Sequence, residues 1–321
     1  MNKLYAIIPI VLAVGIGVGF GIFALSDSEY PASTQIPTKK TVTLAILPTT
    51  QASDIEAQAN ELEQFLEERT NYDVELYVPT SYAGVVEALR FGKADMAFMS
   101  AWPSYLAVQK AGATLELAEI REVAIGDTMT TESYYYSYWV VLKDSPYNTL
   151  EDLRGKRAAF PSPLSTSGYV VPMKSLVETG LVTVESGKEI DPKTYFSGVV
   201  FAGGYGQAWE ALKNNKVDVS VIAGDVSEKL YREVRDNTRV IREQGPIPSH
   251  GVVFSKDMDP EAKQKIKNAL LEMGKDDNSR QIMRKLVSAI FVGFEETTAE
   301  QHIGNLESAL QITGLKYTEK V

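Results

Sequence analysis

Two separate runs of alternating apolar strands and helices restrict the fold of this chain more than any other feature. In the first run, strands are predicted at residues 42–47, 73–78 and 95–99, with helices at 53–69, at 82–91 and from Pro103. In the second run, strands are predicted at residues 157–161, 197–204, 217–224 and 238–243, and helices follow most of them. Such alternation is typical of α/β domains with a largely parallel sheet. The sequence therefore predicts two α/β lobes.

Two segments are suited to carry the chain from one lobe to the other, residues 134–142 and 240–247. On this interpretation the chain leaves lobe one, builds lobe two and returns. We expect lobe one to comprise residues 41–140 and 248–321, and lobe two to comprise residues 141–247. With 321 residues and 44% hydrophobic composition, the chain can bury a core in each lobe. Two crossovers make a hinged pair with a ligand site in the cleft between the lobes.

The N-terminus begins with an apolar stretch that predicts contact with a membrane. Residues 4–25 carry no charge and follow Lys3, and about 20 apolar residues are enough to cross a bilayer. Because a cleaved signal peptide usually has a shorter apolar run, we favour an uncleaved transmembrane helix in residues 1–25, with cleavage as the alternative. The basic start predicts that the main body lies outside the cytoplasm, in the periplasm or at the outer face of the membrane. Residues 26–40 are predicted to be a linker.

Composition excludes several functional classes. The formal net charge is −10, from 42 acidic and 32 basic residues, which argues against nucleic acid as a partner. There are no cysteines and two histidines, so disulfides, cysteine-rich zinc sites and multi-histidine metal sites are excluded. We therefore expect no metal and no cofactor.

Three consecutive hydroxyl residues, Ser165, Thr166 and Ser167, precede Gly168 where a predicted strand gives way to a helix. The N-terminus of a helix has unpaired N–H groups and a partial positive charge, so it attracts anions. Hydroxyl groups in the same turn add donors, and glycine allows the backbone to approach a ligand closely. The alternative is ordinary helix capping, for which serine and threonine are preferred. These three residues alone leave both interpretations open.

Five stretches resemble, in order, the phosphate-, phosphite- and phosphonate-binding proteins of ABC importers. They are residues 79–105, 134–146, 165–172, 200–221 and 245–257. The shared features are a Tyr-Ala-Gly helix start, the Ser-Thr-Ser-Gly sequence with a following proline, and a Gly-Gly pair before a helix. The resemblance covers most of residues 42–284. It implies the two-lobed type II periplasmic-binding-protein fold, in which each lobe has a mostly parallel sheet flanked by helices.

The resemblance also implies a set of ligand-binding residues. The oxyanion cradle of the family falls on the three hydroxyl residues at 165–167. Its phenol donors fall on Tyr82 and Tyr135. A tyrosine hydroxyl can donate to a phosphonate oxygen while its ring excludes water. For each tyrosine, packing in the core or on the surface is the alternative.

Three further positions depart from the family pattern or match it only in part. The family usually has a histidine after the Gly-Gly pair, where this chain has Tyr205, which can donate a hydrogen bond but cannot become cationic. Aminophosphonate binders in the family use two carboxylates for the substrate amine. Asp225 matches the first, unless it is a plain helix N-cap, and His250 occupies the second position. His250 is either an anion donor that changes charge near physiological pH or a histidine at the rim of the site.

These departures weaken the case for 2-aminoethylphosphonate and leave another phosphonate, phosphite or phosphate as the ligand. The implied function is that of an extracytoplasmic, monomeric solute-binding component, not an enzyme, which works with an ABC permease and ATPase. The anion would dock on lobe two, and Tyr82 would reach it as the hinge closes. One alternative is an anchored sensing domain for a small anion with a signalling partner. Another is a serine hydrolase with Ser167 as nucleophile and His250 as base, although the sequence lacks a G-x-S-x-G elbow.

Overall fold

The computed structural model describes residues 40–46, 52–79, 82–286 and 290–315, without the side chains of residues 52–58 and 82. These residues fall within one compact unit, Lys39–Val321. The predicted anchor (1–25) and the predicted linker, apart from Lys40, lie outside the described residues. None of the helices described here is both long enough and apolar enough to cross a bilayer.

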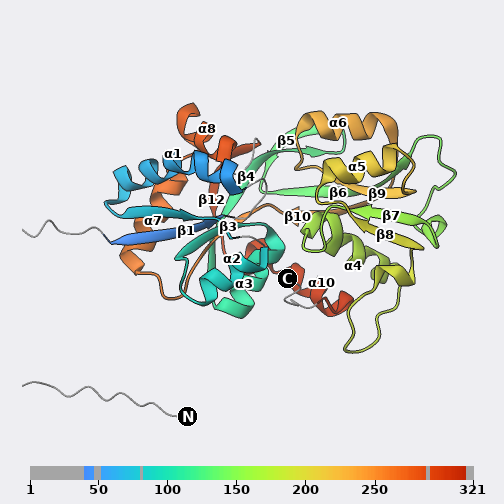
Figure 1. Ribbon diagram of the computed structural model, residues 1–321, viewed down its shortest axis with the longest axis horizontal. Coiled ribbons are helices and arrows are strands. Elements are labelled where there is room, and N and C mark those ends of the chain that lie inside the picture. Colours follow the sequence, from blue (N-terminus) through green and yellow to red (C-terminus); the bar gives the residue numbers. More distant parts are fainter. Residues whose placement is uncertain (1–39, 47–51, 80–81, 287–289, 316–321) are drawn as a thin grey trace, which may run out of the picture. The chain divides into compact units, whose positions relative to one another are not determined.

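The first of two sheets has seven strands (Figure 1). They are β1 (Thr41–Ile46), β2 (Asp73–Tyr77), β3 (Met96–Met99), β4 (Thr114–Ile125), β5 (Thr128–Glu132), β11 (Gly251–Phe254) and β12 (Phe291–Glu296). Their order is β12-β4-β11-β3-β1-β2, and β5 pairs with β4. Strand β1 is parallel to both of its neighbours, whereas all the pairs that involve β4 or β11 are antiparallel.

The second sheet has five strands. They are β6 (Tyr134–Leu142), β7 (Arg157–Phe160), β8 (Gly198–Phe201), β9 (Val219–Ala223) and β10 (Thr238–Pro248), in the order β10-β6-β9-β7-β8. Strand β7 is parallel to β8 and β9, and β6 is antiparallel to β9 and β10.

Both sheets are therefore mixed, and the prediction of mostly parallel sheets was wrong. Parallel neighbours need a long crossover connection, and the parallel pairs form where helices join the strands, as predicted. By contrast, only residues 126 and 127 separate β4 from β5, so these strands can pair only as a hairpin. Gly126 turns this hairpin with φ 60°, a backbone conformation that glycine adopts without strain. The sequence analysis had assigned no strand to residues 114–132.

Helices cover both faces of the first sheet (Figure 1). The helices on one face are α1 (Ala52–Thr70), α7 (Pro260–Glu272) and α8 (Asp277–Leu286). Those on the other are α2 (Tyr82–Arg90), α3 (Ala101–Ala111), α9 (Ala299–Ile303) and α10 (Leu306–Thr313). The alternation of side chains along β1 explains this layering, because Leu44 and Ile46 enter the first core and Ala45 enters the second.

The second sheet is covered in the same way. Helix α4 (Val171–Glu178) packs on one face, and α5 (Tyr205–Lys213) and α6 (Glu228–Asn237) pack on the other. Three short helical turns complete the secondary structure, η1 (Glu151–Leu153), η2 (Thr166–Val170) and η3 (Pro192–Thr194). The helices predicted at 53–69 and 82–91 correspond to α1 and α2.

The chain passes between the two sheets at two adjacent places. It leaves the first sheet between β5 and β6 and returns between β10 and β11. These crossings lie side by side, because the N–H of Ser249 donates to the carbonyl of Ser133 at 2.9 Å. The division into lobes at residues 140/141 and 247/248 stays a prediction, as does hinge motion about these crossings.

Substituting Phe160 tests the core of the second sheet. Its side chain is fully buried and contacts the rings of Trp139, Tyr169 and Phe196. We expect Phe160→Ala to lower the free energy of unfolding by about 3–5 kcal/mol, because it leaves a cavity among these rings. Urea denaturation followed by tryptophan fluorescence measures the change. In the control, Phe91→Ala, the ring is 67% exposed, and we expect a change within about 0.5 kcal/mol. Equal losses in both variants would contradict this description of the core.

Candidate anion-binding site

The three consecutive hydroxyl residues, Ser165, Thr166 and Ser167, lie at the start of a helical segment that runs from η2 into α4. Ser165 is the N-cap, and its Oγ accepts the N–H of Gly168 at 3.0 Å. Helix capping, the alternative given above, therefore describes one role of Ser165. As an acceptor it keeps its own hydrogen to donate, and the first N–H groups of a helix have no acceptor within it. Gly168 allows this tight turn, because a Cβ there would lie 2.1 Å from Pro161.

Thr166 and Ser167 are both buried, and they bond in different directions. The Oγ1 of Thr166 accepts the N–H of Trp102, on α3 of the first sheet, at 3.0 Å. The Oγ of Ser167 lies 3.0 Å from the hydroxyl of Tyr135 and 2.7 Å from that of Tyr205. Three of the predicted site residues, carried by η2, β6 and α5, thus meet at one point. We call Ser167, Tyr135 and Tyr205 the hydroxyl cluster of the site.

A buried ion network adjoins this hydroxyl cluster. Asp225, just after β9, accepts a hydrogen bond from Arg121 Nη1 at 2.8 Å, and Nη2 of the same guanidinium donates to Glu119 at 2.7 Å. The exposed fractions of the side chains are 10% for Asp225, 3% for Arg121 and 2% for Glu119. Tyr135 lies near Asp225, whose charge acts on its phenol, so the network adjoins the hydroxyl cluster. Asp225 does not cap α6, because that helix begins at Glu228 and Ser227 is its N-cap.

The sequence analysis missed Glu119 and Arg121. They lie two residues apart on β4, so their side chains leave the same face of the strand. Opposite charges at this spacing, between the apolar residues of the segment 115–125, were the signal that could have found them. Close approach of the two sheets at Gly224 brings Asp225 to them. The N–H of Ala124 donates to the carbonyl of Gly224 at 2.8 Å, and a Cβ on Gly224 would lie 2.1 Å from the carbonyl oxygen of Ala124.

Burial sets the protonation of these groups. Loss of solvation raises the pKa of the Asp225 and Glu119 carboxyls, although the guanidinium of Arg121 opposes this shift. Burial, followed by the charge of Asp225, raises the pKa of Tyr135 well above its ordinary value of 10.0. The phenol is therefore a neutral O–H donor at physiological pH.

His250 lies next to the ion network, with Nδ1 3.7 Å from a carboxylate oxygen of Glu119. Burial, then the charges of Arg121 and His302, lower the pKa of His250 well below its ordinary value of 6.5. The expected change of charge near physiological pH is therefore not supported, and the imidazole is neutral. The hydrogen bonds of Ser167 go to tyrosines and not to His250, so these two described residues form no nucleophile–base pair.

Tyr82 is the first residue of α2. Its side chain is outside the description, so its contact with an anion stays a prediction.

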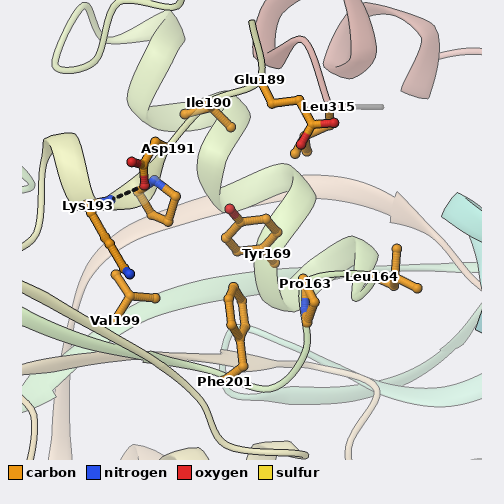
Figure 2. A pocket seen from close by; sticks show the side chains of 11 residues that line it. Pro163, Leu164, Tyr169, Glu189, Ile190, Asp191, Lys193, Val199, Phe201 and Leu315 are labelled. Carbon is orange, nitrogen blue, oxygen red and sulfur yellow. Dashed lines mark hydrogen bonds between the residues drawn. The ribbon is translucent and has the colours of Figure 1, made fainter. Parts of the chain in front are cut away.

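A pocket of about 740 Å³ is lined by residues that flank the Ser165 turn in the sequence, among them Leu164 and Tyr169 (Figure 2). Its lining includes the ring of Tyr169, which contacts that of Phe201, and the side chains of Ile190, Asp191 and Glu189. None of the seven predicted site residues whose side chains are described lines it. Its lining has two carboxylates against one lysine, Lys193, so its net charge is negative and would repel an anion. We therefore do not assign the oxyanion site to this pocket.

Comparisons with known proteins agree with this fold. Residues 44–302 match the family described as "ABC transporter, phosphonate, periplasmic substrate-binding protein". The chain therefore belongs to this family, whose members are binding proteins and not enzymes, which confirms the prediction on that point.

Two curated relatives and one solved structure show the extent of the similarity. The phosphate-import protein PhnD of Mycolicibacterium smegmatis is 34% identical over 66% of this chain; the match covers 64% of its own length, which is less than two thirds. The phosphonates-binding periplasmic protein of Escherichia coli is 25% identical over 84% of this chain and 77% of its own. PhnD1 from Prochlorococcus marinus, solved in complex with methylphosphonate, has a TM-score of 0.66 and 16% identity over 86% of this chain and 99% of its own. At that identity the structure supports the fold alone.

The charge of His250 can be tested directly by proton NMR, because the chain has two histidines. We expect the imidazole resonance that is absent from His250→Gln to titrate with a midpoint well below 6.5. Since the unfolded chain binds this proton more tightly, His250 should lower the free energy of unfolding as pH falls below about 6.5. His302, whose pKa burial also lowers, is the internal reference, and its midpoint should lie above that of His250. A midpoint for His250 at or above 6.5 would show a histidine that is partly cationic at neutral pH.

Proposed function

We propose that the protein is the extracytoplasmic solute-binding component of an ABC importer and binds a phosphorus oxyanion, that is a phosphonate, phosphite or phosphate. The observation that carries the proposal is the convergence of three hydroxyl groups at Ser167, beside the N-terminus of a helix. The relatives are consistent with this ligand class, since their names or bound ligands are phosphate, phosphonates and methylphosphonate.

The chemistry of the hydroxyl cluster suits a tetrahedral oxyanion. Its O–H groups and the first N–H groups of η2 can donate hydrogen bonds, and the helix end adds a partial positive charge. An anion can therefore be bound here without a lysine. Hydrogen bonds to a charged acceptor are shorter and stronger than those between neutral groups. A bound oxyanion would accept the hydrogens that Ser167, Tyr135 and Tyr205 now share with one another. The net charge of −10 is spread over the whole chain and does not prevent this local capture.

Contacts between the two sheets support binding coupled to closure. The Trp102–Thr166 hydrogen bond joins α3 to η2, and the Arg121–Asp225 pair joins β4 to the end of β9. An anion held at η2 would favour the conformation in which these contacts form, and Tyr82 would complete the site from α2. Motion would take place about the adjacent crossings at Ser133 and Ser249. The closed form of a monomer, anchored through its N-terminal segment, would then be recognised by the permease and ATPase subunits.

Removing single hydroxyl groups from the cluster tests the site. We expect Ser167→Ala and Tyr135→Phe each to weaken oxyanion binding by about 1.5–3 kcal/mol, the usual contribution of a hydrogen bond to a charged group. Isothermal calorimetry with phosphate, phosphite, methylphosphonate, ethylphosphonate and sulfate measures the loss and identifies the ligand.

The matched control is Ser220→Ala. Ser220 is equally buried, and its hydroxyl donates to the carbonyl of Ala159 on the neighbouring strand β7. This variant should lose stability but keep its affinity for the anion. If the wild-type protein binds none of the phosphorus compounds, the proposed function is wrong. If it binds them and Ser167→Ala binds as tightly, the function stands and the location of the site is wrong.

A further inference from the structure

The buried ion network beside the hydroxyl cluster contains two carboxylates and one guanidinium. Arg121 holds Asp225 with one terminal nitrogen and Glu119 with the other, at 2.8 and 2.7 Å. Nothing in the binding of an oxyanion by hydroxyl and N–H donors requires such a network. Its position next to Tyr135 nevertheless would bring it near a phosphorus oxyanion held by the hydroxyl cluster.

Two atoms of the network are buried without a hydrogen-bond partner among the described residues, Arg121 Nε and Glu119 Oε1. A buried donor and a buried acceptor left in this way are unusual in folded proteins. Both belong to side chains that are at most 3% exposed. The network is therefore able to make further polar contacts. Its charges interact strongly with nearby groups, because the buried surroundings screen them weakly.

We infer that Arg121 is a specificity-determining residue, which selects phosphorus oxyanions with no substituent or a small uncharged one against those that carry a cationic substituent. This inference rests on the proposed function and deepens it, because it names the class of ligand that the site accepts. On this inference, Asp225 pairs with Arg121 and does not bind the amine of a ligand.

The exclusion of a cationic substituent follows from the geometry of the pair. Asp225 is the carboxylate whose charge acts on Tyr135 of the hydroxyl cluster, and a ligand ammonium group would have to bind it in competition with Arg121. A guanidinium displaced from Asp225 would lose one of its two carboxylate partners and could not reach water in exchange. The planar fork of Arg121 is also fixed by its second bond, to Glu119. An ammonium group would therefore meet a neighbouring positive charge, and that charge already engages one oxygen of each carboxylate.

The same pairing allows an anion to bind close to Asp225. An unpaired carboxylate at this place would repel a phosphate or phosphonate, whose charge is of the same sign. Arg121 offsets the charge of one of the two carboxylates, and its Nε is a donor that no described group uses. His250 is neutral and adds no positive charge, so the arginine alone among the described neighbours provides this compensation.

The test compares two ligands of the same shape and different charge, ethylphosphonate and aminomethylphosphonate. We expect the wild-type protein to bind ethylphosphonate at least 30-fold more tightly in calorimetry. In Arg121→Gln the carboxylates of Asp225 and Glu119 become available, so the ratio should move toward aminomethylphosphonate by at least tenfold. Asp225→Asn should keep the preference for ethylphosphonate, because it removes the carboxylate that an amine would need and leaves Arg121 paired with Glu119.

The control is Arg157→Gln, which removes an arginine that pairs with Asp218 on the surface of the second sheet. It should leave the ratio unchanged. Circular dichroism establishes whether each variant is folded. If Arg121→Gln does not fold, the ratio of the two affinities in the wild-type protein and in Asp225→Asn tests the inference.

Three outcomes would overturn the inference. One is a wild-type protein that binds the two ligands equally or prefers aminomethylphosphonate. Another is a loss of aminomethylphosphonate binding in Asp225→Asn, which would make Asp225 the ligand of the amine. The third is binding of phosphate with rejection of both test ligands, which would show selection by size. If no phosphorus compound binds, the proposed function itself has failed, and this result is distinct from the other three.

Discussion

A guanidinium group that is almost entirely buried must have carboxylate partners nearby, and Arg121 finds them on both sheets. Glu119 lies two residues away on β4, and Asp225 follows β9 of the second sheet. Removing one partner from such a pair typically costs about 3–5 kcal/mol, because a charge is left buried and uncompensated. This requirement keeps β4 against the end of β9, and thereby positions Tyr135 and the start of η2 beside it.

The local structure of the chain could be predicted from its sequence to a large extent. Apolar strands and helix starts are set by neighbouring residues, and β1, α1 and β9 begin within a few residues of their predicted positions. Sheet topology could not be predicted as well. Strands β4 and β5 carry several charged and polar side chains, and they are strands because the hairpin and the antiparallel contact with β11 satisfy their backbone groups. Such pairing depends on distant residues that periodicity does not reveal.

The same distinction between neighbouring and distant residues applies to the candidate site. Ser165, Thr166 and Ser167 were recognisable from a short stretch, since hydroxyl residues before a helix have a local meaning. Tyr135, Tyr205 and Asp225 came from resemblance to a family, because nothing in their own neighbourhoods shows that they meet. Two assignments could not be made from residue type. The neutrality of His250 is a consequence of burial and of Arg121, and the importance of Arg121 depends on a carboxylate about a hundred positions away.

An acidic chain can bind an anion because short-range donors and long-range charge act on different scales. Exposed charges farther away than about 8 Å are largely screened at physiological ionic strength, so most of the 42 acidic residues hardly affect a ligand at η2. Among the described residues, Asp225 is the carboxylate next to the hydroxyl cluster, and it is one of the two that Arg121 holds. The field at the site is thus decided by a few buried groups. A change of ligand preference within this family could accordingly come from a single side chain on β4, with the hydroxyl cluster unchanged.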